Sequence, residues 1–370
     1  MTGAMSGTNR RDPGLNGRSF TAAQSFLLSS KLYWTRKMFP ALREKYNGLA
    51  AKESTPPESA ADVARLIANT PDYQVYAWLE RHLQRFKYSG RYGLQAYHDD
   101  MREDLLASLD QADLPDGMLT LDPDLEMPRY YKAVDIHQHP GGVWSDEIAG
   151  FVYERGARST TPTMGTRHAD LHDRLVMAVD EALESDPTDI FDMACGFGKS
   201  TGPFIERYRD AKITGMDLSA PCVKLAAKTA AEAQANNIRY MQGNAFESGF
   251  ADESFDLVTS TMYLHEMPPP QIEKTIEESA RLLRPGGYMA HLDFFRLPDA
   301  FTRFIHYGHG RRNNEPFMEP LAEMDLAGLL ERNGFKDIRI EPFAEDDGVL
   351  DEGYRPWRFP WTLITGVKAA

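Results

Sequence analysis

The chain has 370 residues, and 41 lysines and arginines against 55 aspartates and glutamates give it a formal net charge of −14. Nucleic acids and anionic membranes are bound mainly through basic surface, so neither is the expected partner of so acidic a chain. The hydrophobic fraction of 42% supplies apolar surface for a folded core, and the length corresponds to roughly two domains.

Location is predicted from apolar runs and cysteine content. No apolar run reaches the roughly 18 residues that cross a bilayer. Residues 1–19 are rich in Gly, Asn, Arg and Ser and lack the apolar segment of a secretory signal, so we expect a disordered tail. Cys195 and Cys222 form no C-x-x-C pair. These features predict a soluble, cytoplasmic protein in a reducing compartment.

Residues 20–127 form the first predicted domain, which is helical. Apolar and aromatic side chains recur three and four residues apart, as at Tyr76, Leu79, Leu83 and Phe86. Proline and glycine interrupt this period at several points, which predicts about four helices in a compact bundle.

Residues 128–165 are predicted to be a connector that caps a neighbouring part of the molecule. The segment is rich in aromatic residues and histidine, and its pattern is neither clearly helical nor clearly extended. His137 and His139 are potential metal ligands, but no nearby Cys or carboxylate triad completes a site, so we expect no metal. Tyr153 is expected to line a pocket; the alternative is a plain core residue.

Residues 166–370 alternate short apolar runs with helical segments, the order expected of a parallel sheet built from βαβ units. Seven strands are predicted, at residues 188–194, 212–217, 238–242, 255–260, 287–294, 336–342 and 362–367.

A glycine-rich loop follows the first of these strands. A P-loop is excluded because Met193 stands where its first glycine is required. A dinucleotide loop stays open, since Gly196-x-Gly198-x-x-x-Gly202 leaves room for a pyrophosphate. The third interpretation is the Asp-x-x-x-Gly-x-Gly motif that binds S-adenosylmethionine. Asp192 favours it, because a carboxylate suits an α-ammonium group, directly or through water, and repels a pyrophosphate.

Polar residues at the ends of the next two strands agree with an adenosyl ligand. Asp217 ends the second strand about 20 residues after the glycines, where a carboxylate can accept both ribose hydroxyls. Asn244 follows the third strand and can accept from the adenine amino group, beside the backbone N–H of Ala245.

Over about residues 171–367 the chain resembles class I S-adenosylmethionine-dependent methyltransferases, in the small-molecule branch similar to the ubiquinone and menaquinone biosynthesis enzymes. The segments that carry this resemblance are 192–198, Asp217, 244–245, 255–258, 264–268 and 282–287. The sequence departs from the family pattern at Ala194, where glycine is frequent, and at Asn244, where aspartate is frequent. Adenine recognition is therefore expected to use an uncharged acceptor.

The resemblance implies an α/β fold: a Rossmann-like sheet in the order 3-2-1-4-5-7-6, with its seventh strand antiparallel, joined to an N-terminal helical domain. It implies S-adenosylmethionine as cofactor, S-adenosylhomocysteine as product and a small-molecule acceptor. It also implies that the helical domain serves as a lid and mediates a homodimer. The cofactor-binding residues it implies are Asp192, Ala194, Gly196, Gly198, Asp217, Leu218, Asn244, Ala245, Phe246 and Thr261.

Three candidate catalytic residues follow the fourth strand or end the fifth. Methyl transfer from a sulfonium is an in-line displacement that depends mainly on alignment, and a hydroxyl acceptor also needs a base. His265 is the candidate base or acceptor clamp; packing near the cofactor sulfur is the alternative. Glu266 could stabilise a histidinium or be solvated, and Asp293 is expected to point toward the ligand crevice.

The acceptor is expected to contact His291, His309, Arg311 and Arg312, with the arginines gripping a carboxylate as a fork. An exposed basic loop is the alternative for the two arginines. Oxygen is the favoured methyl acceptor, with sulfur and nitrogen open. A cyclase that forms azetidine, another alkyl-transfer enzyme and a non-catalytic cofactor-binding module are the alternative functions.

Overall fold

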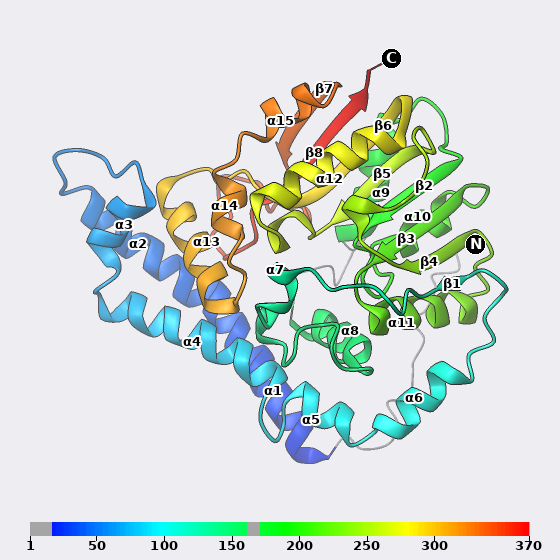
Figure 1. Cartoon of the computed structure of the whole chain (residues 1–370). Coiled ribbons are helices and arrows are strands. Elements are labelled where there is room, and N and C mark those ends of the chain that lie inside the picture. Colours follow the sequence, from blue (N-terminus) through cyan, green and yellow to red (C-terminus); the bar gives the residue numbers. More distant parts are fainter. Residues whose placement is uncertain (1–16, 161–170, 370) are drawn as a thin grey trace.

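The computed structural model describes residues 17–160 and 171–369. A twisted sheet with helices on its faces lies beside a long helical arm, which comprises residues 18–88 (Figure 1). Of the predicted disordered tail, residues 1–16 lie outside the described part, whereas residues 18 and 19 belong to the first helix.

The amino-terminal region is helical, as predicted. Its helices are α1 (Arg18–Tyr33), the π-helical η1 (Trp34–Met38), α2 (Phe39–Ala50), α3 (Ala60–Ile67), α4 (Pro71–Tyr88), α5 (Leu94–Asp99) and α6 (Arg102–Asp110). They fall into the four predicted segments, because α1, η1 and α2 are continuous and α5 and α6 share the last segment. A capping box starts α3: Ser59 Oγ accepts from the Asp62 N–H at 3.1 Å, and the Asp62 carboxylate accepts from the Ser59 N–H at 3.0 Å.

The helical arm shares its core with the carboxyl-terminal half of the chain. Trp34 and Tyr76 are buried in one cluster with Phe301 and Ile305 of α13 (Ala300–Asn313). Burial of such large side chains stabilises the contact by about 1.5–3 kcal/mol for each of them. The arm is therefore held against α13 and can form one wall of a cavity.

The sheet contains the seven predicted strands in the predicted order, with one strand added. The strands are β1 (Leu119–Thr120), β2 (Asp189–Met193), β3 (Lys212–Asp217), β4 (Ile238–Gln242), β5 (Phe255–Thr261), β6 (Leu283–Phe294), β7 (Phe335–Pro342) and β8 (Trp361–Lys368). Their order is β1-β4-β3-β2-β5-β6-β8-β7, with β8 antiparallel to both neighbours. The fold prediction is confirmed, and β1 was missed because two residues carry no alternating pattern.

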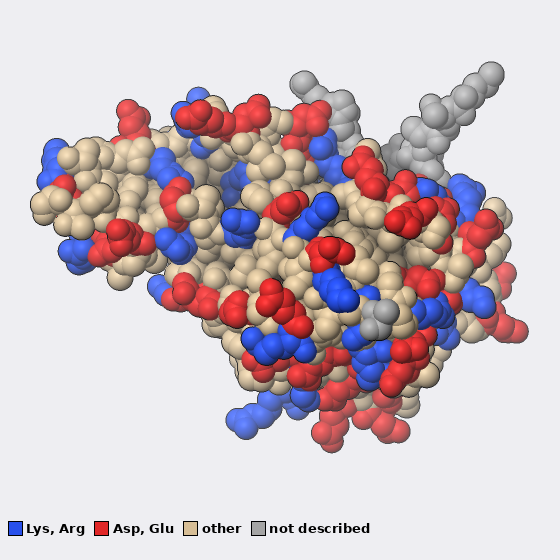
Figure 2. All heavy atoms as spheres, turned by 90° about the horizontal axis from the view of Figure 1, so that it is seen from above, with Lys and Arg blue, Asp and Glu red and all other residues tan. Residues whose placement is uncertain are grey.

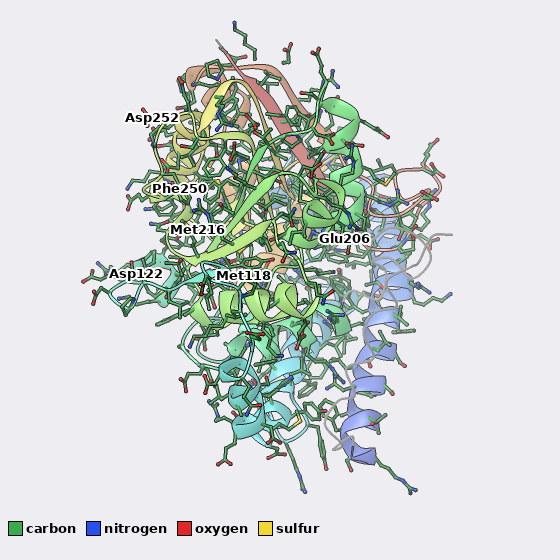
Figure 3. The ribbon with its side chains drawn as sticks, turned by 90° about the vertical axis from the view of Figure 1, so that its right-hand side faces the viewer. Met118, Asp122, Glu206, Met216, Phe250 and Asp252 are labelled. Carbon is green, nitrogen blue, oxygen red and sulfur yellow. The ribbon has the colours of Figure 1, made fainter. Side chains whose placement is uncertain are left out.

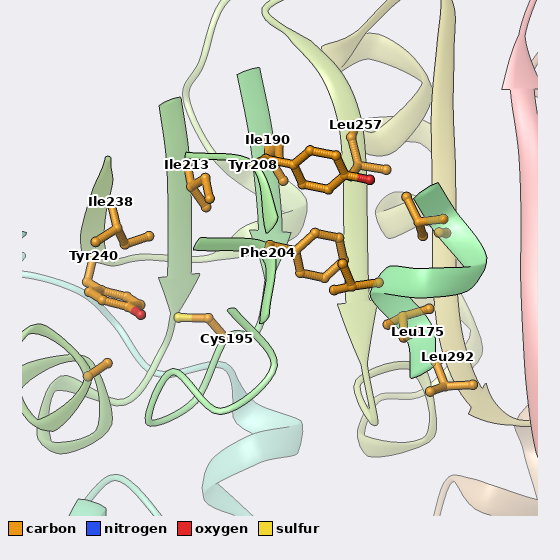
Figure 4. Packing of buried hydrophobic residues seen from close by; sticks show 14 of the residues in the cluster. Leu175, Ile190, Cys195, Phe204, Tyr208, Ile213, Ile238, Tyr240, Leu257 and Leu292 are labelled. Atoms are coloured by element: carbon orange, nitrogen blue, oxygen red, sulfur yellow. The ribbon is translucent and has the colours of Figure 1, made fainter. Parts of the chain in front are cut away.

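A row of branched side chains crosses one face of the sheet. Ile213 is paired with both Ile190 and Ile238, and Ile190 is also paired with Leu257. Figure 4 shows these residues in line, with Phe204 of α10 packed against them. Since both faces are covered, the strands are almost continuously apolar, as buried parallel strands are.

Helices cover both faces of the sheet. They are α9 (Leu171–Ala182), α10 (Thr201–Arg207), α11 (Ala220–Glu232), α12 (Pro269–Leu282), α14 (Met318–Ala322) and α15 (Leu326–Arg332). Short 3₁₀ turns follow β4 and β5, namely η3 (Ala245–Glu247) and η4 (Leu264–Glu266). Acidic and basic side chains are interspersed over the face seen in Figure 2. Within the described residues, no helix combines the length and apolarity needed to cross a membrane.

The connector runs along the sheet edge and then under the carboxyl ends of the strands. β1 precedes the connector at the sheet edge, and the connector itself contains α7 (Arg129–Lys132), η2 (Ile136–Gln138) and α8 (Ala149–Thr160). Figure 3 views this edge, where Met118 O accepts from the Tyr240 N–H at 2.7 Å and Asp122 lies farther out. A Cβ on Gly150 of α8 would lie 2.5 Å from Pro221 O, so α8 packs closely on α11. This brings the connector to the edge where parallel α/β sheets bind ligands.

Candidate active site

The loop after β2 has a left-handed backbone at Ala194, Gly196 and Gly198, with φ values of 56°, 52° and 83°. The two glycines are needed for different reasons. A Cβ on Gly198 would lie 2.8 Å from the Tyr240 hydroxyl, so this position is required by packing. A Cβ on Gly196 would meet nothing closer than Tyr153 at 4.0 Å, so the backbone there faces open space. Gly196 and Ala194 line a cavity, and Gly198 does not.

Asp217, at the end of β3, holds this loop from the other side. Its Oδ2 accepts from the Gly196 N–H at 2.9 Å, and its Oδ1 accepts from the Ser219 N–H at 2.8 Å. Burial raises the pKa of Asp217 to about 6, and the two N–H donors only partly oppose this. A carboxylate has about four acceptor positions, so Asp217 can accept further hydrogen bonds from a ligand in the cavity.

Asp192 lies behind the loop and not on the cavity wall. Its Oδ2 accepts from Ser200 Oγ at 2.8 Å and from Thr201 Oγ1 at 2.6 Å, while its Oδ1 has no partner among the described residues. Burial raises its pKa to about 6. Its contact with a ligand, directly or through water, was predicted from the motif. The structure instead shows Asp192 tying the loop to the start of α10.

The residues predicted to contact adenine are set apart from the cavity. Leu218, Asn244, Ala245 and Phe246 are absent from its wall, whereas Thr261 lines it. Asn244 Oδ1 accepts from the Phe246 N–H at 3.4 Å and caps η3. Of the ten predicted cofactor residues, the cavity therefore brings together Ala194, Gly196, Asp217 and Thr261.

The cavity has a volume of about 260 Å³ and lies between the sheet, the connector and the helical arm. Each of these three parts supplies charged or aromatic groups to its wall. Those that matter below are Lys31, Trp34, Glu80, Lys87, His137, Tyr153, Asp217, His265, Glu266, Phe294, His309, Glu315, Glu345, Trp357, Arg358 and Phe359.

His265 lines this cavity and forms a buried pair with Asp293, which was expected to point toward the crevice but lies behind the wall. The His265 Nδ1 lies 2.7 Å from Asp293 Oδ1, and Asp293 Oδ2 accepts from the N–H groups of Tyr263 and Leu264 at 2.9 and 2.7 Å. Asp293 thus fixes both the turn that carries His265 and the ring itself, with Nε2 left as the other ring atom. Burial would lower the pKa of His265, but the Asp293 carboxylate more than offsets this and raises it.

Glu266 contacts a histidine that was predicted only as a discounted metal ligand. His137 Nε2 lies 3.2 Å from Glu266 Oε1, and His137 Nδ1 lies 2.9 Å from Glu315 Oε1. Burial opposes the charge on His137, yet the two carboxylates raise its pKa to about 10. The cationic ring therefore ties the connector to η4 and to the segment after α13. Glu266 pairs with the His137 ring, and its charge also helps to raise the pKa of His265.

Three of the five predicted acceptor contacts lie elsewhere. His291 is buried between β5 and α12, with Nδ1 at 2.7 Å from Ser260 Oγ, and burial lowers its pKa to about 4. Arg311 is exposed and pairs with Glu319, while Arg312 pairs with Glu80. Both arginines lie on α13 and neither lines the cavity. Tyr153 and His309 do line the cavity.

An aromatic wall, missed by sequence reasoning, leads from His265 to the helical arm. Ring centroids are 4.7 Å apart for His265–Phe294, 4.5 Å for Phe294–Phe359, 4.4 Å for Phe359–Trp357 and 5.2 Å for Trp357–Trp34. These rings come from α1–η1, β6 and the segment before β8, so only the folded chain brings them together.

The sheet is Rossmann-like, with a glycine turn after β2 and the Asp217 carboxylate at the end of β3. This arrangement is typical of enzymes that bind a nucleoside. The "Methyltransferase domain" family model matches residues 190–287. An uncharacterized methyltransferase of Synechocystis is 30% identical over 156 residues, covering 42% of this chain and 70% of that protein. The chain belongs to the class I S-adenosylmethionine-dependent methyltransferases.

Other relatives match shorter parts. The demethylmenaquinone methyltransferase of Thermus thermophilus is 34% identical over 117 residues, which cover 32% of this chain and about half (52%) of that enzyme. Among solved structures, a Haemonchus contortus phosphoethanolamine N-methyltransferase with S-adenosyl-L-methionine is 15% identical, with a TM-score of 0.47, and covers 66% of this chain and 61% of that chain.

Proposed function

We propose that this enzyme transfers the methyl group of S-adenosylmethionine to a small molecule held in the cavity, with oxygen favoured as the accepting atom. The observation that carries the proposal is that His265, paired with Asp293 behind it, lines a cavity that also reaches Asp217. It places a candidate base and a candidate cofactor contact on the wall of one cavity.

The cavity fits the cofactor at the Asp217 end. The open backbone at Gly196 leaves room for a ligand, and Asp217 retains acceptor positions for two ribose hydroxyls. Thr261 Oγ1 is buried without a partner among the described residues, so it could bond a ligand there. When bound, the cofactor supplies an electrophilic methyl group on a sulfonium.

His265 would remove the proton of a hydroxyl acceptor through Nε2. Asp293 holds Nδ1 as the donor, which fixes the tautomer that leaves Nε2 basic, and its charge stabilises the imidazolium formed. For a sulfur or nitrogen acceptor, which has less need of a base, the His265 ring would instead hold the acceptor in position.

The cover over the cavity favours a small acceptor over a macromolecule. The connector and the arm meet over the strand ends, and His137 fastens the connector through Glu266 and Glu315. Partial cover of this kind reduces contact with water, which strengthens electrostatic contacts and protects the sulfonium from side reactions.

Product analysis tests the proposal. The enzyme would be incubated with S-adenosylmethionine carrying a labelled methyl group and with a panel of aromatic acids bearing hydroxyl, thiol or amine groups. We expect S-adenosylhomocysteine in equal amount to a labelled, methylated product. Methylthioadenosine as the nucleoside product would contradict methyl transfer, and cofactor binding without any turnover would indicate a non-catalytic module.

The homodimer through the helical arm stays a prediction. Val75, Trp78 and Phe86 on α4 are more than half exposed, as is Phe26 on α1, so the arm presents an apolar face. Sedimentation of the purified chain would measure its oligomeric state.

A further inference from the structure

The end of the cavity beside the helical arm carries two lysines that the sequence did not single out. Lys31 lies on α1 and Lys87 on α4, and both line the cavity. The Lys31 ammonium donates to Gln84 Oε1 at 3.4 Å, and Gln84 Nε2 donates to the His137 carbonyl at 2.9 Å. Lys31 is therefore held in place by the element that closes the cavity.

Two carboxylates on the same wall, Glu80 and Glu345, are already matched by other cations. Glu80 contacts His309 and Arg312. Glu345 holds Arg358 through both of its oxygens.

Glu266 and Glu315 share His137. Lys31, in contrast, forms no ion pair within 4.0 Å in the described part of the chain. The Glu80 carboxylate attracts its ammonium group from a greater distance. Lys31 thus has no carboxylate of the described residues as a close partner, and an anionic group of a ligand could take that place.

Both ammonium groups are held in an environment that resists their charge. Burial lowers the pKa of Lys31 to about 8, with Glu80 opposing the shift only in part. Burial and repulsion from Lys31 lower the pKa of Lys87 well below its ordinary value. Such groups gain stability when an anion enters, because it restores the attraction lost with water.

The wall around the lysines is apolar and aromatic. Trp34 stacks on Tyr76 with centroids 4.7 Å apart and donates through Nε1 to the Tyr76 carbonyl at 3.1 Å, so its indole is held rigidly. Leu83 and Trp357 complete this part of the wall. Flat, rigid surfaces of this kind bind planar apolar groups with little loss of side-chain entropy.

We infer that Lys31 and Lys87 bind an anionic group of the acceptor, so that the substrates are aromatic or apolar compounds with a carboxylate or similar anion at the end remote from the methylated atom. The aromatic wall from His265 through Phe294, Phe359 and Trp357 to Trp34 separates the two ends. This inference rests on the proposed function and transfers to the lysines the anion-binding role predicted for Arg311 and Arg312.

The test compares 2-naphthoate with its uncharged isostere 2-naphthamide, each titrated into enzyme that is saturated with S-adenosylhomocysteine. We expect the wild type to bind naphthoate about tenfold more tightly than naphthamide, which corresponds to about 1.4 kcal/mol. Lys31→Met should reduce this ratio to about one to threefold, whereas Lys31→Arg, which keeps the charge, should retain most of it. Lys87→Met should also reduce the ratio.

Lys37→Met is the matched control, because Lys37 lies on η1 but is exposed and outside the cavity wall. It should leave the ratio unchanged. Affinity for S-adenosylhomocysteine and the melting temperature, measured for every variant, show whether each remains folded. Equal affinity for the two probes, no naphthoate binding at millimolar concentration, or an unchanged ratio in folded Lys31→Met would overturn the inference. Failure to bind S-adenosylhomocysteine at all would instead count against the proposed function.

Discussion

The two ends of the cavity are built in different ways. The end at Asp217 comes mainly from the ends of β2, β3 and β5 and the turns after them, with Tyr131 and Tyr153 of the connector beside them. The end at Lys31 is assembled from α1, α4, the connector, α13 and the segment before β8. In the sequence these parts extend from Lys31 to Phe359. The first uses geometry common to parallel α/β sheets, and the second depends on how this chain folds its arm onto the sheet. Under the proposed function, the cofactor end would therefore be general to the fold, and the acceptor end would be particular to this protein.

The largest expected effect is on turnover and comes from His265, which lies between the Asp217 end and the Lys31 end of the cavity. His265→Ala should lower turnover by about 10²- to 10⁴-fold for a hydroxyl acceptor, because a positioned base is lost. Affinity for S-adenosylmethionine should change little. The rate would be measured with the fastest compound of the acceptor panel, and Asp293→Asn should reproduce most of the loss. An unchanged rate would leave His265 as a packing residue.

A change at the cofactor end should act on binding. Asp217→Ala should weaken S-adenosylmethionine by about 1–3 kcal/mol, because charged hydrogen bonds are lost. Calorimetry measures the affinity, and Lys31→Met serves as the comparison from the other end, where cofactor affinity should be kept. Equal losses in the two variants would show that the ends are not separate.

A third change separates packing from ligand contact in the glycine loop. Gly198→Ala should destabilise the fold by about 1–3 kcal/mol, since φ is +83° and the added Cβ would lie 2.8 Å from the Tyr240 hydroxyl. Gly202→Ala is the control, because a Cβ at this helical position meets nothing within 4 Å, and it should be neutral or slightly stabilising. Chemical denaturation measures both. Strong destabilisation by Gly202→Ala would show that the loop is misread.

The pH dependence of cofactor binding should follow Asp217. The pKa of this group is raised to about 6 in the free protein, so the carboxyl becomes neutral below that pH and loses its charge for the ribose hydroxyls. Affinity for S-adenosylmethionine should rise with pH through about 6 and then level off. In Asp217→Asn the curve should be flatter; an equally steep curve would assign the titration to another group, such as Asp192, whose pKa is also about 6.

The smallest expected effect is that of Arg311→Ala. This side chain is exposed and paired with Glu319, so the ratio of naphthoate to naphthamide affinity should stay within experimental error. If the ratio fell as far as is expected for Lys31→Met, the result would support the earlier prediction that Arg311 and Arg312 bind the carboxylate.

Much of the fold could be predicted from the sequence, because apolar runs in a fixed βαβ order admit few topologies. Asp217 was recognised for the same reason, since a strand end determines its position. The charged groups were harder to place. Arg311 and Arg312 attracted notice as a pair, but the sequence does not show which face of α13 points outward. Lys31 and Trp34 could not be identified at all, because they reach the cavity only after α1 and η1 dock on α13. His137 was considered only as a metal ligand, although Glu266 and Glu315 are its partners.

The central claim is that the turn after β2 and Asp217 hold an adenosyl sulfonium within reach of His265. Calorimetric titration of the purified protein with S-adenosylmethionine and, separately, with a nicotinamide dinucleotide tests it most directly. We predict saturable one-site binding of S-adenosylmethionine and no measurable binding of the dinucleotide. Heat from the dinucleotide alone would contradict the account.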